Sequence, residues 1–246
     1  MTAKFIRKGL LPLRGVVQVC VALTVFFSTF VFAQAPALKQ NRSITSPDAT
    51  AFIPENAVLN QKLTVDLEND GVDETVLAYA LPDKSNPYRF GIGLRILKYQ
   101  APIGWSVAFE ESPDSMDTGA GPNTLVSIEK VMDAKGKAGV VVVLHYSGAG
   151  TAAAWHVLVA VRNRIVKLDA TGIKAEVLKK RGYWDGGYNS VSTKGDLIIE
   201  YVPGYSKNTA RCCPDRPPLE IRVKFLGTSL SLESVREVLP FTPQKF

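Results

Sequence analysis

Residues 138–147, AGVVVVLHYS, constrain the fold more than any other segment of the chain. The run holds four consecutive valines and no Asp, Glu, Lys or Arg. β-branched side chains favour an extended backbone, and a strand that is apolar at successive positions has to be covered on both faces. The segment therefore predicts a central strand inside a β-rich domain.

Other short β-rich segments surround this one, and turn residues separate them. The clearest turn is Asn69-Asp70-Gly71, which lies between two strand-like runs and predicts a β-hairpin. Strands are expected at 62–68, 74–81, 89–100, 104–111, 124–133, 138–147, 153–161, 164–169, 196–202, 219–227 and 229–238. We predict a mainly β fold of antiparallel hairpins, as a meander sheet or a sandwich, with few or no helices beyond the N-terminal segment.

Residues 1–33 have the pattern of a signal peptide. Four basic residues come first, an apolar run follows over 16–32, and VFAQA then offers small residues for cleavage after Ala33. The protein is therefore expected to be exported, as a periplasmic or secreted protein. An uncleaved anchor is the alternative, because the apolar run approaches the ~18 residues that span a bilayer. Membrane contact is expected only through this segment, if it is uncleaved.

The rest of the chain divides into a tether and one domain. Residues 34–60 are polar with three prolines and predict a flexible tether, and residues 61–246 predict a single β-rich domain. Residues 1–33 contain four of the 29 basic residues and none of the 23 acidic ones, so cleavage lowers the net charge from +6 to +2. The only dense basic run left is KKR at 179–181. Nucleic acid is therefore not an expected partner.

The segment DLENDGVDE carries acidic side chains at close spacing around a glycine that allows a sharp turn. A hard cation such as calcium needs several oxygens that converge from one short loop. The segment resembles a single FG-GAP/VCBS-type repeat, a family whose loops often bind calcium on extracellular β-propellers. The resemblance implies that Ca²⁺ would be held by Asp66, Glu68, Asp70, Val72 and Glu74. The alternative is a hairpin stabilised by Asx hydrogen bonds, with its acids in water.

Cys212 and Cys213 are adjacent, and Pro214 follows them. An oxidising compartment would allow a disulfide between them, which would lock a local turn but close almost no loop. Two reduced thiols, a bridge between chains and a metal site are the alternatives. Residues 195–227 around the pair resemble a segment of exported bacterial proteins related to LppP/LprE lipoproteins, a resemblance that implies no particular activity.

The segment RGYWDGGYNS places three aromatic side chains around a carboxylate and two glycines. An exposed aromatic platform beside a carboxylate suits sugar stacking and hydroxyl recognition. The candidate ligand-binding residues are Tyr183, Trp184, Asp185 and Tyr188. The alternative is a loop that packs its aromatic residues onto the core.

No set of residues has the spacing of a known catalytic motif. We therefore expect a non-catalytic binding or interaction module of the cell envelope. The alternative is an extracytoplasmic hydrolase that acts on a carbohydrate or envelope substrate, with Asp185 or His156 as the base. The simpler interpretation of His145 and His156 is that each is a structural side chain on a strand. A structural spacer is a third class.

Overall fold

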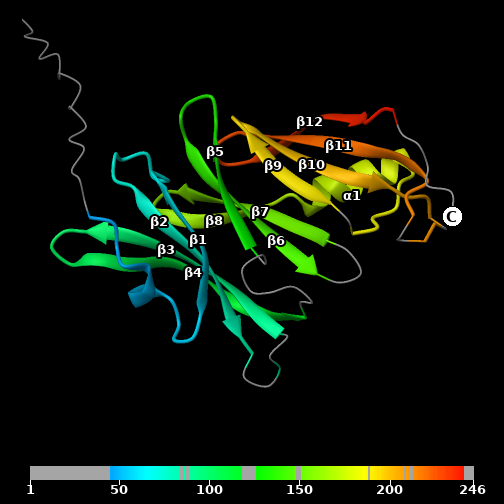
Figure 1. Ribbon diagram of the computed structural model, residues 1–246. Coiled ribbons are helices and arrows are strands. Elements are labelled where there is room, and N and C mark those ends of the chain that lie inside the picture. Colours follow the sequence, from blue (N-terminus) through cyan, green and yellow to red (C-terminus); the bar gives the residue numbers. More distant parts are fainter. Residues whose placement is uncertain are drawn as a thin grey trace, which may run out of the picture. The chain divides into compact units, whose positions relative to one another are not determined.

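The computed structural model describes residues 45–83, 86, 89–117, 126–147, 151–187, 189–207, 209–210 and 213–240. Among these residues it has twelve strands, one α-helix and one short 3-10 helix. The strands form three antiparallel sheets of four strands each (Figure 1). The predicted mainly β fold is therefore confirmed. The proposed signal segment, 1–33, lies outside the described residues.

The first sheet is a meander in which each strand pairs with the next one along the chain. The Asn-Asp-Gly turn joins its first two strands, as the sequence predicted. Its strands are β1 (Val58–Val65), β2 (Glu74–Pro82), β3 (Arg89–Gln100) and β4 (Gly104–Asp117).

The middle sheet is also a meander and contains the valine run. Its strands are β5 (Val126–Met132), β6 (Ala138–Ser147), β7 (Thr151–Val161) and β8 (Arg164–Asp169). Alternate residues of β6 enter two separate cores, with Val140 and Val142 in one and Val141 and Val143 in the other. The prediction that this strand is covered on both faces is confirmed.

The third sheet follows helix α1 (Thr171–Arg181) and is again a meander. Asp169 accepts hydrogen bonds from the backbone N–H and the hydroxyl of Thr171 at the start of α1, and Gly182 ends the helix with a φ of 68°. Left-handed backbone of this kind favours glycine. The strands are β9 (Ser190–Lys194), β10 (Leu197–Gly204), β11 (Arg216–Phe225) and β12 (Leu230–Glu237).

Two apolar cores hold the sheets together. The first core joins side chains of the first sheet, such as Ile96, and Leu67 of the turn between β1 and β2 to one face of the middle sheet. The second core joins the other face of the middle sheet to the third sheet, where Phe225 is fully buried, and to Leu178 of α1. Helix α1 therefore packs in the second core and covers no face of the first sheet.

The structure describes residues 45–60 of the predicted tether, 34–60. This segment contains the 3-10 helix η1 (Ala49–Phe52) and the first residues of β1. The carbonyl oxygens of Thr45, Pro47 and Phe52 accept hydrogen bonds from side chains of the first sheet. These contacts satisfy backbone acceptors and tie the segment to the sheet, which its polar composition did not reveal.

Candidate functional site

A pocket of about 520 Å³ lies between α1, β7, β10 and the loop that follows α1. Its walls combine apolar and aromatic side chains with a few charged groups, the composition of many small-molecule sites. The lining residues include Trp155 of β7, Lys174 of α1, Trp184 and Asp185 of the loop, Asn189, and Glu200 of β10.

Glu200 forms the buried floor of this pocket and is only 1% exposed. The Trp155 indole N–H donates to Glu200 Oε2 over 2.9 Å, and the Asn189 side-chain amide donates to Glu200 Oε1. Lys174 Nζ lies 3.1 Å from the same Oε1. A buried carboxylate is costly unless it is paired and hydrogen-bonded, and here both oxygens have donors.

Lys174 links the floor to the rim of the pocket. Its ammonium contacts Asp185 Oδ2 at 3.0 Å as well as Glu200. Burial opposes the charge of Lys174, but the Glu200 and Asp185 carboxylates outweigh that effect and raise the pKa of the amine. Lys174 is therefore charged at neutral pH. An ammonium has three donors, and these two contacts use two of them.

The aromatic loop is fixed in place with its rings half-buried. Trp184 pairs with Tyr205 through a backbone N–H···O bond of 2.9 Å, and their rings meet edge to face at 6.3 Å. The Tyr183 hydroxyl donates to the carbonyl of Pro217, and the Arg216 guanidinium lies 5.2 Å from the centre of the Tyr183 ring. Neither Tyr183 nor Trp184 is fully buried.

Three of the four predicted ligand-binding residues, Tyr183, Trp184 and Asp185, thus line one pocket. The fourth, Tyr188, lies outside the described residues. Lys174 and Glu200 were not predicted as pocket residues from the sequence. Glu200 stands within the apolar strand run DLIIEYV, and an acid in a buried strand was the signal that could have identified it.

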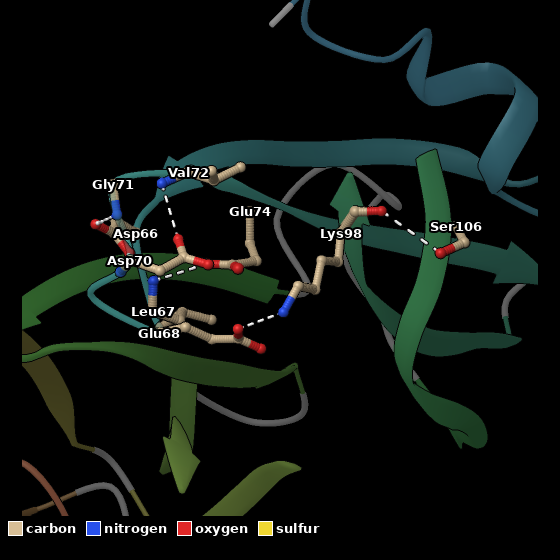
Figure 2. Close-up of polar contacts among 9 residues, drawn as sticks. All are labelled: Asp66, Leu67, Glu68, Asp70, Gly71, Val72, Glu74, Lys98 and Ser106. Atoms are coloured by element: carbon tan, nitrogen blue, oxygen red, sulfur yellow. Dashed lines mark hydrogen bonds and ion pairs between the residues drawn. The ribbon is translucent and has the colours of Figure 1, made fainter. Parts of the chain in front are cut away.

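In the acidic turn between β1 and β2, the Asp66 and Asp70 carboxylates accept backbone N–H groups of the same turn (Figure 2). Asp66 accepts the backbone N–H groups of Asp70 (3.1 Å) and Gly71 (2.9 Å). Asp70 accepts the N–H of Val72 at 2.8 Å. These bonds are those of an Asx-stabilised hairpin.

The other two acids of the predicted ligand set, Glu68 and Glu74, have different partners. Glu68 forms an ion pair with Lys98 of β3, and Glu74 Oε2 accepts the N–H of Leu67 at 2.8 Å (Figure 2). Within the described ranges, no group of three or more His, Cys, Asp or Glu side chains is arranged to hold a metal ion. Calcium binding by Asp66, Glu68, Asp70, Val72 and Glu74 stays a prediction from the resemblance.

The two histidines lie on opposite faces of the middle sheet. His156 is 4% exposed, and its Nε2 lies 3.2 Å from Glu111 Oε2 of β4. His145 Nε2 shares a hydrogen bond of 3.0 Å with the Ser127 hydroxyl, and burial lowers the pKa of His145. Since Trp155 and His156 are consecutive on β7, the pocket that Trp155 lines and the His156 side chain lie on different faces.

Only one of the two adjacent cysteines belongs to the described part of the chain. Cys213 is disulfide-bonded, and Cys212, like Cys20, lies outside that part. Nearby, Asp215 accepts the hydroxyl and the N–H of Ser206, and these bonds lower the pKa of Asp215 to about 2. Pairing of Cys213 with Cys212 stays a prediction.

Comparison of the chain with protein-family models, with curated proteins and with solved structures finds no significant match. No helix in the described ranges is long and apolar enough to cross a membrane.

Proposed function

We propose that this protein is an exported binding module of the cell envelope and that its ligand is a neutral, hydroxyl-rich molecule such as a carbohydrate. The pocket beside α1 is the site. The proposal rests on the Lys174–Asp185 ion pair, which lines the same pocket as Trp184.

Charge balance favours a neutral ligand. The charged side chains that line the pocket are Lys174 and Lys179 against Asp185 and Glu200, so their formal charges cancel. A sugar hydroxyl both donates and accepts, so adjacent hydroxyls match a carboxylate beside an ammonium. The apolar face of a sugar ring suits an aromatic side chain such as Trp184.

The placement of the candidate bases favours binding over hydrolysis. Asp185 lines the pocket and pairs with Lys174, while His156 pairs with Glu111 on the other face of the middle sheet. A general base has to lie within hydrogen-bonding reach of the water or nucleophile it activates. His156 therefore lies out of reach of a substrate in this pocket, and the Asp185 carboxylate is already paired with the Lys174 ammonium.

Tryptophan fluorescence tests the proposal, because two of the three tryptophans, Trp155 and Trp184, line the pocket and Trp105 does not. Mono- and oligosaccharides are titrated into the mature protein and into Asp185→Asn, Lys174→Gln and Trp105→Phe. We expect a saturable change for some sugar in the wild type and in Trp105→Phe, with binding weakened at least about tenfold in the two pocket variants. No saturable change with any sugar, or equal binding by all four proteins, would refute the proposal.

A further inference from the structure

A second cavity, of about 310 Å³, lies beside the acidic turn, away from the pocket described above. Its wall combines polar and apolar side chains from the first and middle sheets. They are Glu68, Glu74, Ile96, Lys98, Gln100, Ala108, Asn163 and Ile165. Ala108 is exposed, so the cavity has one side at the protein surface.

Glu74 is the unusual member of this wall. The residue is 1% exposed, and one carboxylate oxygen, Oε2, accepts the N–H of Leu67. The other oxygen, Oε1, is buried without a hydrogen-bond partner among the described residues. An unpartnered buried acceptor costs free energy, so this oxygen favours a ligand that brings a donor.

The charges around the cavity favour a cation. Asp66, Glu68 and Asp70 lie around Glu74, and all three repel negative charge on it. Lys98 supplies an ammonium, and it pairs with Glu68 (Figure 2). One ammonium does not balance the negative charges of Asp66, Glu68 and Asp70, so the local electrostatics favour a second positive group in the cavity.

The lining indicates which kind of cation would fit. A calcium ion needs six to eight oxygens around it, whereas this wall carries Ile96, Ile165 and Ala108 beside its polar groups. An alkyl chain would bury apolar surface against those three residues. We propose that this cavity binds a small organic ammonium ion, whose N–H groups donate to Glu74 Oε1 and whose alkyl part packs against Ile96 and Ile165.

Amide NMR spectra of the mature protein test the proposal, with n-propylammonium chloride as the probe. The N–H of Leu67 is the reporter, because it already donates to Glu74. We expect a saturable shift of this resonance with propylammonium and none with n-propanol, which has the same chain without the charge. Sodium chloride at equal ionic strength controls for screening.

Two variants make the test specific. Glu74→Gln keeps the shape and removes the charge, and we expect binding at least about tenfold weaker. Ala108→Phe fills the exposed side of the cavity without changing any charge, and we expect loss of binding. Glu233→Gln removes an exposed acid of β12 and is the matched control, with unchanged affinity expected.

Each opposite result overturns the proposal. These results are equal shifts with propanol and propylammonium, no saturation in the wild type, or full affinity in a folded Ala108→Phe variant. A saturable response to calcium chloride but not to propylammonium would mean a metal site and would also overturn it. The sugar titration probes different residues, so either proposal can fail while the other stands.

Discussion

The buried carboxyl of Glu74 makes the stability of the protein depend on pH in a direction opposite to that of most acids. Burial raises the pKa of Glu74 from 4.5 to about 7, although the hydrogen bond from Leu67 lowers it somewhat. The folded protein therefore holds this proton more tightly than the unfolded chain. The contribution is fully favourable below pH 4.5 and is lost as the pH rises through 7.

The magnitude follows from the difference of 2.5 between the two pKa values. Each pKa unit corresponds to about 1.4 kcal/mol, so ionisation of Glu74 lowers the free energy of unfolding by about 3 kcal/mol above pH 7. Glu74→Gln stays neutral at every pH, and its amide oxygen can still accept the N–H of Leu67. We expect the variant to be up to about 3 kcal/mol more stable than the wild type at pH 8, and close to it at pH 4.

Urea unfolding of both proteins at half-unit steps between pH 4 and 8 measures this difference. Subtracting the two curves removes the titration of every group that does not interact with Glu74. The exposed Glu233→Gln variant is the control, and its difference from the wild type should stay flat. A flat difference for Glu74→Gln, or a wild type more stable than the variant at pH 8, would refute the reasoning.

Three further outcomes are expected from urea unfolding. Trp155→Phe removes the indole donor from buried Glu200 and should cost about 1–3 kcal/mol; a loss below about 0.5 kcal/mol would contradict this. The pKa of Glu111 is lowered to about 2, chiefly by its histidine partner, so its contribution is present above pH 4.5 and lost as the pH falls towards 2. Glu111→Gln should flatten this loss of stability at low pH and cost about 1 kcal/mol at pH 6, a reduced figure because the side chain is 32% exposed. The same loss of stability between pH 4.5 and 2 in the variant and the wild type would contradict this. A Cβ on Gly204 would lie 2.4 Å from the Arg216 carbonyl oxygen, so Gly204→Ala should lower the unfolding free energy by at least about 2 kcal/mol. A Gly204→Ala variant as stable as the wild type would contradict this.

Much of the fold could be predicted because the strands pair with their neighbours in sequence. The segment 89–100 was predicted with the bounds that β3 has, and the strand predicted at 124–133 contains β5. Alternation and turn residues are local signals, and a meander needs little else. The strand β9 was missed because SVSTK is short and polar, and its pairing with β10 stabilises it.

Helix α1 and the floor of the pocket were harder to predict. The helix carries only two buried side chains, Val177 and Leu178, so its sequence shows no wide apolar stripe. The pocket joins β7, α1, the loop after α1 and β10, and its residues Trp155 and Glu200 are 45 positions apart in the sequence. The loop itself was found because its aromatic residues are adjacent, whereas the groups that hold it, Lys174 and Glu200, are 26 positions apart.

The two-sided middle sheet has a consequence for how the chain folds. Within each sheet the pairing is local, so each meander can begin to form before distant parts of the chain meet. Yet a middle sheet on its own would expose apolar side chains, such as Val141 and Val142, on both faces. The first sheet buries its apolar side chains against the middle sheet, and the third sheet buries its own against the middle sheet and helix α1. Loss of the middle sheet would therefore uncover both cores at once, and we expect the three sheets to unfold together in a single cooperative transition.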